Sequence, residues 1–177
     1  MRQPDPQKLD ALVGRMVGEL GASVTGATVL LGDQLGIYKA MADGVPVTPE
    51  SLARKTGYKE RYLREWLSAQ AAAEYIDYND EDGTFSLSPE QAMAFAEEDS
   101  PAFFGGAFEI MQSIWLDEPK IAEAFRTGAG VGWHDHSQCL FRGTERFFRP
   151  GYNAHLIEEW IPAIDGLKDK LDHGATV

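Results

Sequence analysis

Apolar residues recur along the first forty residues at the spacing of an α-helix. The first stripe consists of Leu9, Leu12, Val13, Met16, Val17 and Leu20, and the second of Val24, Ala27, Thr28, Leu31, Leu35 and Tyr38. Positions three or four apart lie on one helical face, so residues 8–41 are predicted to be helical, in two pieces that meet at Gly21. Two long apolar faces are more surface than a small domain easily covers. We therefore expect them to pack against a second copy of the chain.

The pattern changes between Pro46 and Leu87 to a short helix, a turn and a second helix. Thr48 is a good N-cap for a helix that begins at Pro49, and Gly57 suits the left-handed residue that ends it. A second helix is predicted from Lys59 to Ala73. Its inner face carries Leu63, Trp66, Leu67 and Gln70.

A β-hairpin is predicted to follow, with strands at Tyr75–Tyr78 and Thr84–Leu87 around an acidic turn. Apolar and polar residues alternate in both segments, as a half-buried hairpin requires. A helix-turn-helix followed by a hairpin is the winged-helix pattern. The fold class is therefore predicted to be mainly α, built around one winged helix.

The rest of the chain is predicted to be helical with one long irregular segment. Helices are expected at 88–96, 102–116, from Glu118-Pro119 onward, at 152–160 and at 162–172, with a helical turn at 144–148. Residues 128–143 are irregular, and loops of this length are often functional. Residues 175–177 look like the beginning of a strand.

The charge balance narrows the classes of partner. Sixteen basic and 28 acidic residues give a formal net charge of -12, which disfavours binding to nucleic acid and to anionic membranes. No apolar run approaches the ~20 residues of a membrane span. The single cysteine, Cys139, excludes an internal disulfide framework and suits a reducing cytoplasm.

The irregular segment holds the side chains that are the best candidates for metal binding or catalysis. His134, Asp135 and His136 stand close together, and Cys139 follows. Two histidines two residues apart can share a metal ion on extended backbone, but the spacing is equally that of polar loop residues at a pocket mouth, and no metal site is predicted. Cys139 lacks a defined catalytic partner. The glycines at 128, 130 and 132 lack the preceding strand of a phosphate-binding loop.

A winged helix also raises the alternative of a DNA-binding transcriptional regulator. The second helix offers Lys59, Arg61 and Arg64 to phosphates or bases. Nearby glutamates offset these charges, and the expected wing tip at 80–82 consists of three carboxylates. Such a wing is unsuited to contact with the DNA backbone.

Four segments together resemble one family. They are Leu30–Tyr38, Tyr62–Leu67, Asp99–Phe103 and Gly143–Tyr152. They resemble the N-terminal region of bacterial two-domain class I S-adenosylmethionine-dependent methyltransferases. The resemblance implies a homodimer through the N-terminal helices, a winged helix that does not read DNA, and a small-molecule acceptor.

The resemblance also implies how the chain is divided. Residues 1–98 would hold the N-terminal helices and the winged helix, 99–174 a helical substrate-capping segment, and 175–177 the start of a Rossmann-like domain that is otherwise absent. S-adenosylmethionine would bind in the full-length parent, and this chain alone is expected to be an inactive fragment without a bound cofactor.

The site residues follow from the same resemblance. Phe147, Arg149 and Tyr152 match the family's pocket positions, with Trp133, His134 and His136 as further pocket candidates from the loop. No catalytic residue is carried over. If a proton is removed from the acceptor, His134 or His136 is the candidate base.

Overall fold

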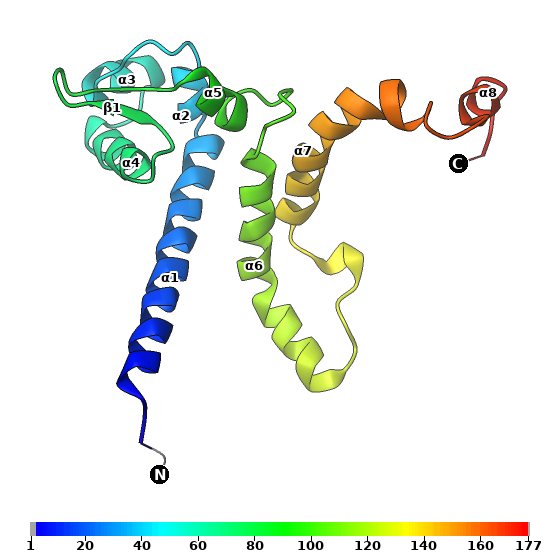
Figure 1. The fold of residues 1–177 in the computed structure, drawn as a ribbon, viewed down its shortest axis with the longest axis horizontal. Helices are drawn as coiled ribbons and strands as arrows, with labels where there is room; N and C mark the ends of the chain where they lie inside the picture. The colour runs from blue at the N-terminus through cyan, green and yellow to red at the C-terminus, as the bar shows by residue number, and fades with distance from the viewer. Residues whose placement is uncertain (1–2, 177) are drawn as a thin grey trace. The chain divides into compact units, whose positions relative to one another are not determined.

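The computed structural model describes residues 3–176, which form two compact units that divide between Gln91 and Ala92. Helices dominate both units, and the sheet within the described residues is a single antiparallel pair of strands (Figure 1). The predicted fold class, mainly α around one winged helix, is confirmed.

The N-terminal helix is longer and straighter than expected. Helix α1 (Pro6–Gln34) is capped by Asp5, whose carboxylate accepts hydrogen bonds from the backbone N–H groups of Gln7 and Lys8. It runs through Gly21, so the predicted break there is wrong. Glycine weakens a helix without ending it when both flanks are helical. The break comes instead at Gly36, whose φ of 65° starts the short helix α2 (Ile37–Met41).

The C-terminal end of α1 is anchored on helix α4 (Glu60–Ala72). Gly32 lets the two helices approach, because a Cβ there would overlap the ring of Trp66. The Trp66 indole N–H donates to the carbonyl of Thr28 at 2.8 Å. Gln70, fully buried, bonds the Tyr38 hydroxyl at 2.6 Å and the Thr28 hydroxyl at 2.8 Å. These hydrogen bonds fix the direction of α1 relative to α4 within the first unit.

The winged helix forms as the sequence predicts, except that both strands are shorter than expected and the first begins at Asp77 and is exposed throughout. Helix α3 (Pro49–Thr56) has a capping box between Thr48 and Ser51, and Gly57 ends it with a φ of 79°. Strands β1 (Asp77–Asn79) and β2 (Thr84–Ser86) pair antiparallel. The core beneath them is apolar and includes Ile37, Met41, Val47, Leu52, Leu63, Leu67, Ile76, Phe85 and Leu87.

The second unit contains fewer and longer helices than predicted. After α5 (Pro89–Phe95), which spans the division between the units, helix α6 (Gly105–Thr127) continues through Pro119. Helix α7 (Gln138–His155) likewise continues through Pro150. The separate helices expected around these two prolines are therefore joined. A proline removes one backbone hydrogen bond, and in α6 the ion pair from Lys120 back to Asp117 at 2.8 Å spans the weakened turn.

Within the described residues, only short helical segments follow α7. A π-helical turn, η2 (Leu156–Trp160), follows α7, and α8 (Leu167–Asp172) begins after Gly166 rather than at Pro162. Ala175 and Thr176 belong to no strand, and Val177 lies outside the described residues. The predicted strand at 175–177 stays a prediction.

Candidate functional site

Most of the predicted site residues lie on the helical pair α6 and α7 of the second unit. The two helices run antiparallel and are joined by residues 128–137, which include the short 3-10 turn η1 (Trp133–Asp135) (Figure 1). Their backbones touch where Gly106 faces Gly143. A Cβ on Gly143 would lie 2.8 Å from the Gly106 carbonyl oxygen. The two glycines therefore set the close approach of the pair.

The surface between α6 and α7 is charged rather than apolar. Glu109 of α6 is completely buried and accepts hydrogen bonds from Arg142 and, at 3.1 Å, from Arg146. Arg146 also reaches Glu98 at 3.3 Å. A buried carboxylate is tolerated when it is paired and hydrogen-bonded, so these arginines are what allow Glu109 to sit inside the pair.

Arg149, a predicted pocket residue, belongs to the same network. Its guanidinium donates to Glu145 at 3.0 Å and to Glu98 at 3.2 Å. Both contacts lie within the second unit. In this structure Arg149 therefore stabilises the start of the unit against α7.

An aromatic row follows α7 and contains the predicted residues Phe147 and Tyr152. Consecutive ring centroids are 5.4 Å apart for Phe104 and Phe147, 5.0 Å for Phe147 and Phe148, 6.3 Å for Phe148 and Tyr152, and 5.7 Å for Tyr152 and Trp160. Phe148, Tyr152 and Trp160 are about half exposed. The row offers a ribbon of ring surface suited to a flat apolar molecule.

Trp133, also predicted, lies in a separate cluster around η1. Its ring is 5.3 Å from Phe141 and 6.0 Å from His136, centroid to centroid. The structure thus brings Trp133 together with His136, and Phe147 together with Tyr152.

Sequence reasoning missed the residue that organises this loop, Asp117. Its buried carboxylate accepts the Ser137 hydroxyl at 2.6 Å, the Ser137 backbone N–H at 2.9 Å, the Lys120 ammonium at 2.8 Å and the His136 Nδ1 at 3.2 Å. The hydrogen bonds from Lys120, then Ser137, then His136 hold the pKa of Asp117 well below its usual range. The only signal in the sequence is a carboxylate directly after the apolar run Ile114–Leu116.

The two histidines of the loop differ sharply. The His136 side chain is 21% exposed and is held by Asp117. The His134 side chain is 87% exposed, and its Nε2 lies 3.7 Å from an Asp135 carboxylate oxygen. No cluster of three His, Cys, Asp or Glu residues suited to a metal ion occurs within residues 3–176. Cys139 is buried in α7, and burial raises the pKa of its thiol, which disfavours the nucleophilic thiolate.

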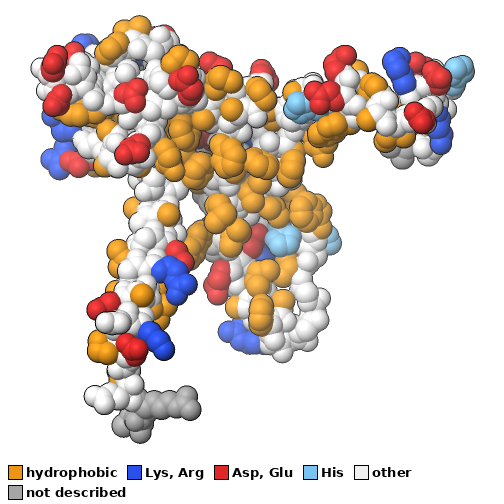
Figure 2. All heavy atoms as spheres, viewed as in Figure 1, with side chains coloured by type: hydrophobic (Ala, Val, Ile, Leu, Met, Phe, Trp, Pro, Cys, Tyr) orange, Lys and Arg blue, Asp and Glu red, His pale blue; other side chains and the backbone are white. Residues whose placement is uncertain are grey.

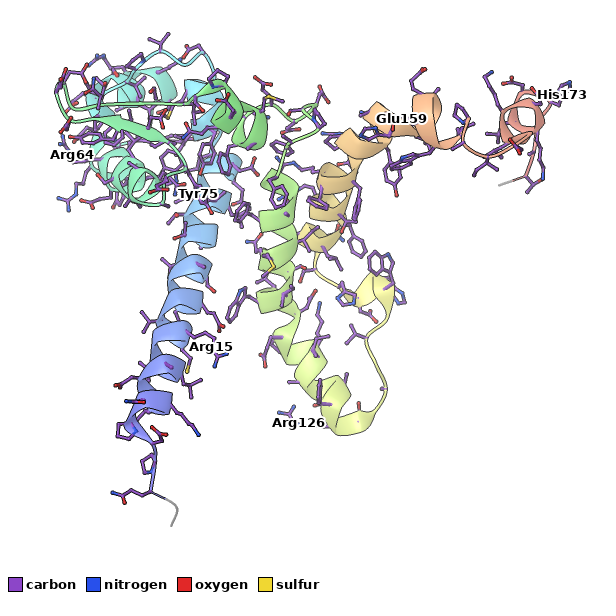
Figure 3. All side chains as sticks on the ribbon, in the orientation of Figure 1. Arg15, Arg64, Tyr75, Arg126, Glu159 and His173 are labelled. Atoms are coloured by element: carbon purple, nitrogen blue, oxygen red, sulfur yellow. The ribbon has the colours of Figure 1, made fainter. Side chains whose placement is uncertain are left out.

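The first unit has a hollow of about 690 Å³ between α3, α4 and the hairpin. It is lined by Pro49, Arg64, Ser68, Ala71, Ala72, Tyr78, Gly83 and Phe85. Arg64 stands on the outside of α4 (Figure 3) and pairs with Glu50 at 2.9 Å and with Glu60. Its charge is therefore offset by two carboxylates, Glu50 of α3 and Glu60 of α4.

Comparisons with known proteins agree with this architecture. Residues 22–97 match the sequence model of the Rv2258c-like winged helix-turn-helix domain. No curated protein sequence matches the chain. Among the described residues, no helix has the length and apolar character needed to cross a membrane.

Two solved structures share the fold. One is PigF with SAH, with a TM-score of 0.60, 15% identity, and coverage of 88% of this chain and 48% of that chain. The other is CalO1, a methyltransferase in calicheamicin biosynthesis in its SAH-bound form, with a TM-score of 0.58, 22% identity, and coverage of 93% and 50%. This chain thus spans about half the length of each. The resemblance to methyltransferase structures is confirmed at the level of the fold.

The one sheet of the described residues contains no parallel strand. Nucleotide cofactors of this kind are held at a glycine loop that follows a parallel strand, with a carboxylate for the ribose. The sheet in residues 3–176 is one antiparallel hairpin, and the positive-φ glycines after α6 follow a helix.

Proposed function

We propose that this chain is the N-terminal, dimerising and substrate-capping part of an S-adenosylmethionine-dependent methyltransferase that acts on a small-molecule acceptor. The observation that carries the proposal is the fold shared with about half of two SAH-bound structures, one of which is the methyltransferase CalO1. The cofactor would be held by residues of the parent outside this chain. The fragment itself would be inactive.

The dimerising role rests on α1. All residues from 3 to 24 are exposed, and the apolar side chains among them remain uncovered (Figure 2). Those with exposures between 45% and 66% are Leu9, Leu12, Val13, Met16, Val17, Leu20 and Val24. A stripe of this length is unusual on a monomer. We propose that two copies cover it in a two-fold homodimer.

The capping role rests on the second unit. Residues 99–174 would form the capping segment, and residues 1–98 the dimerising and winged-helix part. The half-exposed row from Phe147 to Trp160 and the Trp133 cluster supply apolar surface for a flat acceptor. We propose that Phe147, Tyr152 and Trp133 contact that acceptor, and that Arg149 supports them through its pairs with Glu98 and Glu145.

The distribution of charge argues against the alternative of a DNA-binding regulator. Arg61 pairs with Glu65 at 3.0 Å, and Arg64 with Glu50 and Glu60. The turn of the hairpin carries three successive carboxylates at 80–82. A phosphate backbone would meet paired arginines and an acidic wing, so the counterion release that drives DNA binding is not available.

A methyl-transfer assay tests the proposal. The natural reading frame that encodes this chain, including any codons beyond Val177, is expressed and incubated with S-adenosylmethionine and a panel of phenols and aromatic amines. We expect a methylated product by mass spectrometry, and we expect Tyr152→Ala to raise KM for that acceptor. Absence of methylation across the panel, together with tight binding to a DNA site, would overturn the proposal.

A further inference from the structure

The loop between α6 and α7 holds one histidine in a fixed environment and leaves its neighbour exposed. His136 ends the turn η1, where its backbone N–H bonds the Trp133 carbonyl at 3.3 Å. Its ring Nδ1 lies 3.2 Å from Asp117 of α6. His136 is therefore held by one hydrogen bond of its backbone and one of its ring.

The chemistry of Asp117 fixes the tautomer of that ring. The carboxylate receives the Ser137 hydroxyl and backbone N–H and the Lys120 ammonium in addition to His136. These donors stabilise the ionised form of Asp117, which can only accept hydrogen bonds. The Nδ1 of His136 must then carry the proton in its bond to Asp117. In the neutral ring this leaves the lone pair on Nε2.

We propose that Asp117 and His136 form a proton-accepting pair, in which His136 Nε2 takes the proton from a hydroxyl or amine of the small-molecule acceptor. This rests on the proposed function. In the step, the O–H or N–H bond of the acceptor breaks and its electron pair stays on the heteroatom. A new N–H bond forms at Nε2, and the resulting imidazolium is stabilised by Asp117. Asp117 acts through His136 and is a positioning residue.

The surroundings of His136 suit this role. The Trp133 ring is 6.0 Å from the imidazole and stacks edge-on with Phe141, so one side of His136 is apolar. The charged groups packed nearby are Asp117, Lys120, Asp135 and the titratable His134. Lys120 is engaged by Asp117 and by the Asp135 carbonyl, so it is already bonded within the loop. His134 lacks a buried carboxylate of its own, which makes it the matched control.

The tautomer can be measured in the chain itself. Two-bond proton–nitrogen correlations on histidine labelled with ¹⁵N should show His136 as the Nδ1–H tautomer near neutral pH, and His134 as a mixture. Asp117→Asn replaces an acceptor oxygen with a donor group and should move His136 towards the Nε2–H tautomer, while the backbone spectrum confirms the fold. An Nε2–H tautomer in the unmodified chain, or the same mixture at both histidines, would overturn the proposal.

A second measurement tests the catalytic consequence in the product of the natural reading frame. His136→Gln should lower kcat for a weakly acidic phenol by about 10²- to 10⁴-fold, with KM within a few fold, whereas His173→Gln, at the end of α8, leaves both unchanged. The loss should shrink for nitrophenols, which ionise without a base. Equal effects of the two variants would refute the assignment. If no acceptor is methylated at all, the proposed function fails, while the tautomer measurement still decides the pair.

Discussion

A single glutamate placed in the α1 stripe should separate the proposed dimer. Seven apolar side chains of the stripe are each about half exposed, so covering the remainder contributes about 1 kcal/mol per side chain. Two protomers then gain roughly 14 kcal/mol, which is of the same order as the ~4–15 kcal/mol cost of association. The dimer is therefore sensitive to any loss within the stripe.

Leu20→Glu introduces that loss twice, once in each protomer. Each copy gives up the apolar contribution of Leu20, about 1 kcal/mol, and must also desolvate a carboxylate at a cost of several kcal/mol. The sum exceeds about 5 kcal/mol, which corresponds to an increase of more than ~10³-fold in the dissociation constant. Residues 3–24 are exposed, so the fold of the protomer should be unaffected.

Sedimentation equilibrium at micromolar concentration measures the effect. The unmodified chain should have twice the monomer mass, and Leu20→Glu the monomer mass. Ala11→Glu is the matched control, because Ala11 lies nine residues earlier and, at about 100° per residue, on the opposite face of the same helix. It should remain dimeric. A monomeric unmodified chain, or equal behaviour of the two variants, would show that the stripe is not the interface.

Three further predictions concern Asp117, Gly143 and binding to DNA. Folding lowers the pKa of Asp117, so the ionised carboxylate stabilises the folded state. This contribution is present above pH ~4, the ordinary pKa of aspartate, and is lost as the pH falls below it. The difference in unfolding free energy between the unmodified chain and Asp117→Asn, from urea denaturation, should shrink as the pH falls through that range. Gly143→Ala should cost about 1–3 kcal/mol by the same assay, because its Cβ meets the Gly106 carbonyl, whereas Gly151→Ala, which meets open space, should not destabilise. Anisotropy titration should show no duplex bound with the dissociation constant of ~10⁻⁸ M that is typical of specific sites. A selected sequence bound that tightly would support the alternative of a DNA-binding regulator.

The winged helix was predictable because its signals are local. Thr48 and Gly57 mark the ends of α3, and the apolar residues of α4 have helical spacing. Such signals depend on backbone geometry within a few residues. Neither long-range packing nor ion pairing needs to be known to interpret them.

The second unit was less predictable because distant residues decide its structure. Pro119 and Pro150 are strong local signals for a helix end, yet both lie inside helices. The pairing of α6 with α7 depends on the facing glycines Gly106 and Gly143 and on the buried Glu109. Neither feature has a sequence pattern that separates it from an ordinary exposed residue.

The candidate site shows the same division. The sequence pointed to His134 and His136 together, because both stand in one glycine-rich loop. Only the structure distinguishes them, through a carboxylate nineteen residues away from His136 along the chain. The contact depends on how α6 and the loop fold together, which spacing alone does not specify.

Calorimetry with S-adenosylhomocysteine on two proteins, this 177-residue chain and the product of its natural reading frame, tests the division into capping and catalytic parts. We expect saturable binding near micromolar by the product of the natural reading frame and none in that range by this chain. Aromatic stacking alone, at roughly 1–3 kcal/mol per ring by analogy with base stacking, falls short of the ~8 kcal/mol that micromolar affinity needs. A micromolar dissociation constant for this chain alone would place the cofactor site within residues 1–177 and contradict the division into capping and catalytic parts.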